Sequence, residues 1–306
     1  MTPVVAVTGT NGFVGHHVAR EFAQSGYHVV GIGREPRVSP GLEGVVDEYI
    51  SCDLSSEWPT VDRIDTVVHL AGLAAVGASF HHPQLYIETN SRIVTNIGEH
   101  YLGRPEEERP RIIAVSSGAV YGGAVEGPVV ETTPLEISSP YVVSKVLVEN
   151  QLAYYSRRGL ESVVARPFNH IGPGQGPGFI VPDLIASLRA SMATGAPFTS
   201  GNLSTVRDYT DVRDVAHAYR LLADAPVLES SIYNICSGVG RSGAELLALL
   251  VSEMAAEGVA TDAILGTNLR PTDASVIVGD SSRVAAELGW TRRYDLRDSL
   301  RDAVAR

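Results

Sequence analysis

Tyr141 and Lys145 stand four residues apart in SSPYVVSKVLVEN (138–150), and their types and spacing point to proton transfer. The stretch Tyr141–Arg157 is predicted to be a helix, in which residues four apart leave the same face. An ammonium beside a phenol favours the phenolate and lowers the pKa, which is about 10 in free tyrosine. The pair therefore predicts a proton donor and acceptor that works near neutral pH.

The first half of the chain has the pattern needed to position such a pair. Short apolar runs alternate with helical patterns, which is typical of a parallel sheet covered by helices. The predicted strands are Val4–Val7, His28–Ile32, Thr66–Leu70, Ile112–Val115 and Ser162–Ala165. The predicted helices are Phe13–Ser25, Pro83–Tyr101 and Tyr141–Arg157. Ligands of such α/β sheets bind in the crevice at the carboxyl ends of the strands.

The pattern changes after Arg166. The run RPFNHIGPGQGPGFIVP (166–182) is rich in glycine and proline and is predicted to lack regular structure. Helices are predicted again at Val212–Ala223, Gly243–Ala256 and Leu296–Ala305. We expect a cofactor-binding domain over residues 1–166 and a smaller C-terminal lobe over residues 167–306. Some segments of this lobe are expected to return to the sheet.

A glycine-rich turn joins the first predicted strand to the first predicted helix. Gly9, Gly12 and Gly15 have the spacing G-x-x-G-x-x-G within VVAVTGTNGFVGHHVA. Such a turn lets the backbone approach a pyrophosphate, which the helix N-terminus then caps. The intervening Asn11, Phe13 and Val14 are expected to contact the cofactor with them. The alternative is a purely structural turn, but its place inside a βαβ pattern favours dinucleotide binding.

The end of the second strand bears on the choice of cofactor. NAD-selective dinucleotide folds place an acid there, which bonds the ribose 2′-hydroxyl. This chain has Gly33 followed by Arg34, and a guanidinium can hold a 2′-phosphate. NADP(H) is therefore favoured over NAD(H), unless Arg34 only stacks on adenine or faces solvent. Asp53 is expected beside the adenine, although a turn at the end of a strand would also explain it.

The composition excludes several classes of protein. The 306 residues are 44% hydrophobic, which allows a sizeable core, and a net charge of −11 disfavours a nucleic-acid partner. Cys52 and Cys236 are too few for a disulfide framework and lack metal-ligand spacing, so no metal is expected. Neither a signal peptide nor an apolar run of about 20 residues is present. A cytoplasmic protein without a membrane partner is expected.

With the glycine turn, VSSGAVYG (115–122) and YVVSK (141–145), the whole chain resembles the extended short-chain dehydrogenase/reductase family, whose members act on nucleotide sugars. The resemblance implies a Rossmann-like, doubly wound sheet. It implies that Tyr141 is the acid/base, that Lys145 holds the nicotinamide ribose and that Ser117 bonds the substrate carbonyl oxygen. The further cofactor contacts that it implies are Leu54, Leu70, Ala71, Gly72 and Asn90.

Within this family, the details resemble GDP-4-keto-6-deoxy-D-mannose reductases and related ketoreductases. Dehydratases need an acid after the serine or threonine, where this chain has Gly118 and Ala119. Epimerising GDP-fucose synthases need a cysteine in the site, and neither cysteine lies in a matching motif. The reductase resemblance rests on ARPFNHIGPGQ, RDYTDVRDV, YNICSG and LRPTDASVIVGDSSR. It implies a nucleotide-sugar substrate held by Ser116, Asn169, Phe179, Arg207 and Arg270.

Other interpretations remain open from the sequence. A 4-epimerase would share Ser117, Tyr141 and Lys145 but would keep a tightly bound NAD. A catalytically silent sensor or scaffold would bind the cofactor without turnover. His170 is either a substrate contact or a core histidine. A homodimer is expected, paired through the helix of Tyr141 and the helix that carries Asn90.

Overall fold

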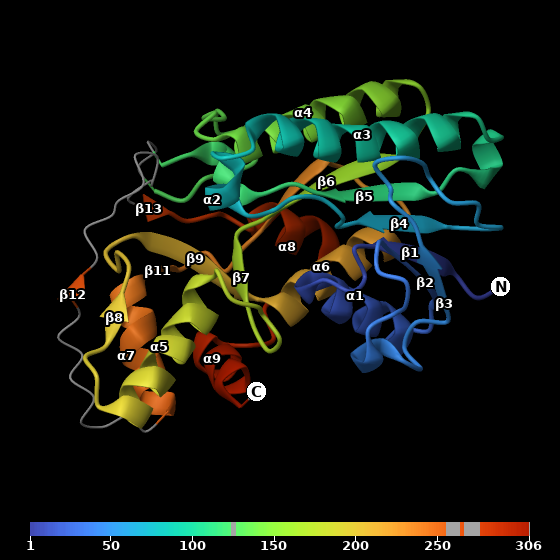
Figure 1. The fold of residues 1–306 in the computed structure, drawn as a ribbon. Helices are drawn as coiled ribbons and strands as arrows, with labels where there is room; N and C mark the ends of the chain where they lie inside the picture. The colour runs from blue at the N-terminus through green and yellow to red at the C-terminus, as the bar shows by residue number, and fades with distance from the viewer. Residues whose placement is uncertain (124–126, 255–263, 266–275, 306) are drawn as a thin grey trace.

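A parallel sheet forms the centre of the protein (Figure 1). The computed structural model describes residues 1–123, 127–254, 264–265 and 276–305. Among these, seven strands pair in the order β3-β2-β1-β4-β5-β6-β10, all parallel, as in a doubly wound fold. They are β1 (Val4–Thr8), β2 (His28–Gly33), β3 (Glu48–Ser51), β4 (Thr66–His69), β5 (Arg111–Val115), β6 (Ser162–Pro167) and β10 (Ile232–Ile235). The predicted Rossmann-like class is confirmed.

Helices cover both faces of this sheet. On one face lie α3 (Pro83–Leu102) and α4 (Pro140–Arg157), and on the other lie α1 (Phe13–Gln24) and α6 (Val212–Asp224) (Figure 1). Side chains alternate between the faces along a strand. In β1, for example, Val5 and Val7 pack in the cluster that includes α1 and α6, while Ala6 packs in the cluster that includes α3 and α4. The sheet is therefore buried on both faces, which explains its nearly continuous apolar strands.

The prediction that residues 166–182 lack regular structure is wrong. Three parts of this segment are regular: the last two residues of β6, then β7 (Asn169–Ile171), and the start of α5 (Ile180–Thr194). Proline at position 182 fits this helix because it lies in the first turn, where the backbone N–H has no intrahelical partner. Glycine and proline mark the ends of these short elements rather than a continuous loop.

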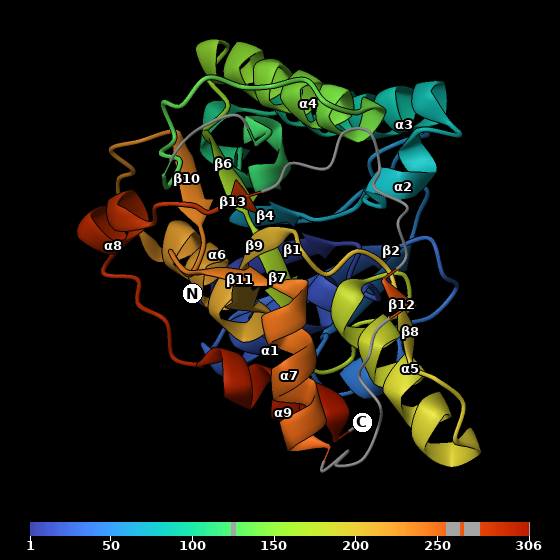
Figure 2. The ribbon, with the colours of Figure 1, turned by 90° about the vertical axis from the view of Figure 1, so that its left-hand side faces the viewer.

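The C-terminal lobe is built on a small sheet in which β9 (Val206–Asp211) pairs with β7, β11 (Gly240–Ser242) and β13 (Val276–Ile277). Figure 2 shows α5, α7 (Gly243–Glu253) and α9 (Leu296–Val304) gathered beside it. The remaining short α-helices and strands are α2 (Val76–Ser79), β8 (Thr199–Ser200), β12 (Ile264–Leu265) and α8 (Ser282–Leu288), and three short 3-10 helices lie at Pro40–Leu42, Glu106–Glu108 and Gly118–Tyr121. Meanwhile β10 and α6, both later than residue 167, belong to the main sheet and its cover. The domain boundary at residue 166 stays a prediction.

Candidate active site

The glycine turn is shaped by close backbone contacts. Gly9 has a φ of +69°, and its N–H donates to the carbonyl of Ile32 at 2.8 Å. A Cβ atom on Gly15 would lie 2.3 Å from the Gly9 carbonyl oxygen and 2.5 Å from that of Thr10. Only glycine fits there, so α1 can begin directly behind the turn. Its first turn includes Phe13 and Val14, and this cradle of exposed backbone at a helix N-terminus fits a dinucleotide pyrophosphate.

Asn11 ties this turn to the loop that follows β2. Its amide donates to the carbonyl of Arg37 at 2.9 Å, and its side-chain oxygen accepts from the Ser39 N–H at 2.8 Å. The Asn11 amide also lies 3.1 Å from the Tyr49 hydroxyl. The side chain thus positions the loop that bears Arg34, and a direct contact with the cofactor stays a prediction.

Charged groups gather at the ends of β2 and β3. Arg34 is exposed, and its charge acts on Asp53. The Asp53 carboxylate accepts from the N–H and hydroxyl of Ser55, and these bonds hold its pKa below the usual range. Asp53 therefore forms a strand-end turn. Glu35, which the sequence analysis did not single out, places a second carboxylate here, beside Tyr49.

The end of β4 is held by hydrogen bonds from the interior. The N–H groups of Leu70 and Ala71 both donate to the Thr8 hydroxyl at 3.0 Å. The loop then passes Gly72, where a Cβ atom would approach the Asn90 side-chain oxygen to 2.8 Å. These bonds fix the loop directly opposite the glycine turn.

Asn90 and Leu54 are buried behind these loops. The Asn90 amide bonds the backbone N–H and carbonyl of Leu73 and the hydroxyl of Ser144. Its polar groups thus link α3, α4 and the loop after β4, and a direct contact with the cofactor stays a prediction. Leu54 packs in the core with only 4% of its surface exposed. Both residues position the expected cofactor surface.

Tyr141, the expected acid/base, lies in the first turn of α4. The Ser139 hydroxyl caps this helix by accepting from the Val142 N–H at 3.2 Å, and Pro140 occupies its first position. Tyr141 is 7% exposed, and its phenol is hydrogen-bonded to Ser117, which follows β5. The structure thus brings together two residues 24 positions apart, as the sequence predicted.

Burial, rather than the ammonium, dominates the chemistry of Tyr141. Its pKa is raised by desolvation, and the hydrogen bond from Ser117 only partly offsets this. The Lys145 ammonium lies 5.8 Å from the centre of the phenol ring and donates to the Val115 carbonyl at 2.8 Å. Burial lowers the pKa of Lys145 itself to about 8. Burial thus raises the pKa of Tyr141 above its usual value, whereas the spacing of Tyr141 and Lys145 predicted a lowered pKa.

A buried ion pair behind the site was missed in the sequence. Glu149 lies one helical turn beyond Lys145, and its carboxylate bonds Arg166 of β6 at 2.6 and 2.9 Å. The Ser116 hydroxyl donates to the same carboxylate. Ser116 is thus directed into the interior, a geometry that does not favour its expected contact with the substrate. The repeated four-residue spacing of Tyr141, Lys145 and Glu149 was the available signal.

The expected substrate residues are spread over the C-terminal lobe. Asn169 of β7 and Phe179, which precedes α5, are exposed, whereas Arg207 of β9 is partly buried. Arg270 lies outside the described residues. His170 stacks on Phe13 with ring centres 6.1 Å apart, and burial lowers its pKa. His170 therefore docks the segment after β6 against the start of α1.

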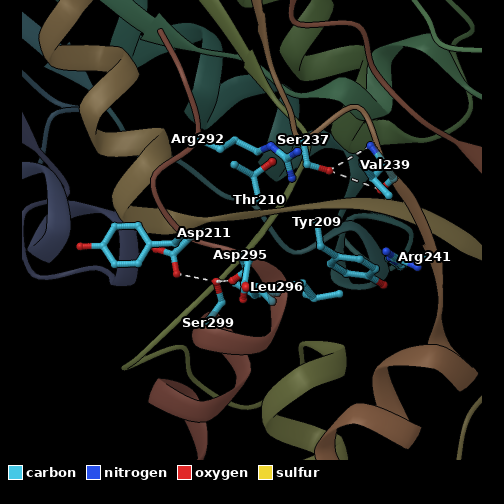
Figure 3. Close-up of a pocket in the computed structure, with 12 residues that line it drawn as sticks. Tyr209, Thr210, Asp211, Ser237, Val239, Arg241, Arg292, Asp295, Leu296 and Ser299 are labelled. Atoms are coloured by element: carbon cyan, nitrogen blue, oxygen red, sulfur yellow. Dashed lines mark hydrogen bonds between the residues drawn. The ribbon is translucent and has the colours of Figure 1, made fainter.

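A cleft of about 220 Å³ opens in this lobe (Figure 3). Tyr209 and Arg241 both belong to its lining, and Ser299 donates to Asp211 at 2.6 Å. Thr210 is 2% exposed, and its hydroxyl has no hydrogen-bond partner among the described residues. Ser117, Tyr141 and Lys145 do not line this cleft. It is lined by Ile171, Tyr209, Thr210, Asp211, Ser237, Val239, Arg241, Arg292, Tyr294, Asp295, Leu296 and Ser299.

The described part of the chain has neither a metal-binding cluster nor a membrane-spanning helix. No cluster of three or more His, Cys, Asp or Glu side chains there could hold a metal ion. No described helix has both the length and the apolar character needed to cross a membrane.

Comparison with known proteins identifies the family. The model of the "NAD dependent epimerase/dehydratase family" matches residues 5–236, which include the glycine turn and the Ser117–Tyr141–Lys145 cluster. The chain belongs to this family. It is thus a member of the extended short-chain dehydrogenases/reductases, enzymes that modify nucleotide sugars.

Relatives within the epimerase/dehydratase family differ in their reactions. The chain is 30% identical to GDP-6-deoxy-D-mannose reductase of Pseudomonas aeruginosa, over 98% of this chain and 96% of that protein. It is 26% identical to UDP-glucose 4-epimerase 3 of Oryza sativa, over 97% and 88%. The structure of Thermus thermophilus UDP-glucose 4-epimerase with NAD superposes with a TM-score of 0.84 and 27% identity, covering 99% and 98%.

The tight packing at Gly15 makes a prediction for stability. The substitution Gly15→Ala should lower the free energy of unfolding by about 1–3 kcal/mol, because the added methyl group overlaps backbone atoms. Urea unfolding would measure this. Gly176→Ala is the matched control, since a Cβ atom there meets nothing within 4 Å. Equal stability of both variants would show that the turn is not constrained as described.

Proposed function

We propose that the protein reduces the C4 ketone of a nucleoside-diphosphate 4-keto-6-deoxyhexose with NADPH. The observation that carries the proposal is the charge and space at the end of β2. Position 33 is glycine, so no ribose-binding acid stands there, and a Cβ atom at this position would lie 2.6 Å from the Tyr49 hydroxyl and would have to displace it. Arg34 follows it and is exposed. A free NADPH that is exchanged at each turnover suits a reductase.

The surroundings of Ser117 favour reduction over dehydration. Gly118 follows it, and a Cβ atom there would lie 2.8 Å from the Phe168 ring. An acidic side chain therefore has no room at this position, and Ala119 supplies none. The site thus holds one hydroxyl pair, Ser117 and Tyr141, which suits a single protonation of one oxygen.

The mechanism follows from the placement of these side chains. When the dinucleotide is bound, its nicotinamide would supply the hydride, while the glycine turn would hold the pyrophosphate and Lys145 the nicotinamide ribose. Ser117 donates a hydrogen bond to the C4 oxygen and orients the ketone. Tyr141, kept protonated because burial raises its pKa, donates its proton to the oxygen as negative charge develops there. We propose that Asn169, Phe179, Arg207 and Arg270 hold the nucleotide part of the substrate.

A 4-epimerase is the second candidate, because relatives of similar identity carry that name. An epimerase of this kind returns the hydride to its substrate and consumes no NADPH. A 4-ketoreductase oxidises one NADPH for each sugar. We place the reductase reaction in the cytoplasm, where NADPH is kept reduced.

The deciding experiment assays GDP-, dTDP- and UDP-linked 4-keto-6-deoxy sugars with NADPH and assigns the product at C4 by NMR. Stoichiometric loss of NADPH absorbance is expected with one of these substrates. Tyr141→Phe should lower the rate at least about 100-fold, the usual contribution of a positioned acid, while NADPH affinity changes little. A nicotinamide that copurifies with the protein, with interconversion of 4-epimers and no net oxidation, would instead establish the epimerase.

Arg34 should control the choice between NADPH and NADH. Arg34→Ala removes a charge-assisted bond to the 2′-phosphate, so the ratio of kcat/KM for NADPH to that for NADH should fall about 10- to 100-fold. Arg104→Ala, which breaks an exposed pair with Glu108 far along the chain, is the matched control. An unchanged ratio in Arg34→Ala would remove this role, and Glu35 would then merit the same test.

We also propose a homodimer formed through α3 and α4. Val143, Leu147, Asn150 and Tyr154 recur at helical spacing on α4, and none of them belongs to a core cluster. Tyr154 is 46% exposed, and Leu85 of α3 is 53% exposed. A second copy of the same helix pair would cover this largely apolar stripe.

A charged substitution in this stripe of α4 tests whether it forms the dimer interface. Leu147→Arg should convert the dimer to a monomer, because it buries an unpaired charge in the interface. Light scattering after gel filtration would measure the mass. Val227→Arg is the control, since Val227 is exposed at 75% away from these helices. A Leu147→Arg protein that keeps twice the chain mass would exclude this interface.

A further inference from the structure

The last residue of β5 and the two residues that follow it are bonded to three residues spaced one turn apart on α4. The Val115 carbonyl accepts from the Lys145 ammonium at 2.8 Å, and the two later residues use their hydroxyls. We call this set the strand–helix seam. Its pairs are Val115 with Lys145, Ser116 with Glu149, and Ser117 with Tyr141.

Glu149 is the one member of the seam that is fixed from a third element. Arg166 of β6 bonds both of its carboxylate oxygens, and the two side chains are 8% and 3% exposed. Arg166 is itself held by the Tyr121 hydroxyl at 2.8 Å and by the Glu131 carbonyl at 3.2 Å. A buried pair with this many partners has one favoured geometry, because any rotation would leave a charge unpaired.

We propose that Glu149 is a positioning residue, which Arg166 anchors so that Ser116 holds the adjacent Ser117 opposite the Tyr141 phenol. The Ser116 hydroxyl points into the interior, and its bond to Glu149 fixes the chain direction at Ser117. The kinetic part of this inference rests on the proposed function, whereas its spectroscopic part does not.

Glu149 also acts on Lys145 through its charge. Burial lowers the pKa of Lys145 to about 8, and the Glu149 carboxylate opposes this by favouring the ammonium. The other groups that face Lys145 are Tyr141 and His69, whose pKa is lowered to about 3, so that it is neutral near pH 7. Without the carboxylate, the uncompensated Arg166 would repel the ammonium as well. Lys145 would then lose its proton at a lower pH.

The composition of the chain allows the pKa of Lys145 to be measured directly. Of the 24 lysines and arginines, 23 are arginine, and Lys145 is the only lysine. Growth with isotope-labelled lysine therefore gives a single side-chain NMR signal for the full-length protein. Its titration reports the pKa of Lys145 with no substrate and no activity.

The first experiment titrates this signal in Glu149→Gln. We expect the pKa of Lys145 to fall by about one pH unit or more, the usual effect of removing a close opposite charge. In the pH profile of kcat/KM, the alkaline limb should shift to lower pH by the same amount, since the lysine must stay charged for the reaction. Glu161→Gln is the matched control: it removes the partner of Arg111, at the other end of β5, and should change neither.

Two more variants separate charge from packing. The double variant Glu149→Gln/Arg166→Gln leaves neither member of this ion pair buried without its partner. The titration of Lys145 can therefore be done in it if the single variant unfolds. The Lys145 pKa of the double variant should lie between those of the wild type and Glu149→Gln. Ser116→Ala removes only the hydroxyl of the seam. It should leave the Lys145 pKa unchanged and lower kcat about tenfold or more through misplacement of Ser117, with the KM for NADPH preserved.

The outcomes are distinct. A Lys145 signal that titrates identically in the wild type, Glu149→Gln and the double variant would overturn the electrostatic role. A wild-type kcat in Ser116→Ala would overturn the positioning role. If the wild type itself oxidises no NADPH with any of the ketosugars, the proposed function fails, while the titration of Lys145 still decides the influence of Glu149.

Discussion

The packing of α4 against the carboxyl end of β5 is the constraint on which the site depends. A helix that begins beside a strand end can present one stripe of residues to it, and this stripe carries a phenol, an ammonium and a carboxylate. Each group is tied to a neighbouring position of the strand end. Because the strand is fixed in the middle of a parallel sheet, the reactive groups inherit its rigidity.

Burial sets the proton chemistry of this site. A phenol enclosed by α4, Tyr86 and the residues after β5 holds its proton, because the phenolate would be poorly solvated. The same enclosure weakens the charge of the lysine. These directions suit the proposed reduction of a ketone, in which the tyrosine must enter the reaction protonated. The Glu149 carboxylate, one turn away, favours the charged form of Lys145, and Arg166 holds that carboxylate in place.

Polar side chains around the expected cofactor surface act mainly as supports. Asn11 holds the loop after β2, Asn90 holds the loop after β4, and Thr8 bonds the backbone at the end of β4. This leaves backbone groups and glycine surfaces to face the dinucleotide. Close approach of a phosphate needs small residues at the contact and firm supports behind them. The supports come from the glycine turn, from α3 and from the end of β1.

Much of the fold could be predicted from the sequence, because its signals are local. Apolar runs and glycine spacing placed the main strands, α1, α3, α4 and α6 to within about two residues at each end. The spacing of Tyr141 and Lys145 likewise predicted that both leave one face of a helix. The parts that were missed, such as β3, β7 and α5, are short or contain glycine and proline. Their formation depends on neighbours far along the chain rather than on their own pattern.

The tertiary structure alone decided what surrounds each group. The direction of the tyrosine pKa depends on burial, which no spacing of residues reveals. The pairing of Glu149 with Arg166 joins a helix to a strand, and the inward turn of Ser116 follows from that pair. The sequence by itself determined which reactive groups share a helix face, because covalent geometry fixes it. Only packing determined how far these groups are buried, which charges lie beside them and which hydrogen bonds they make.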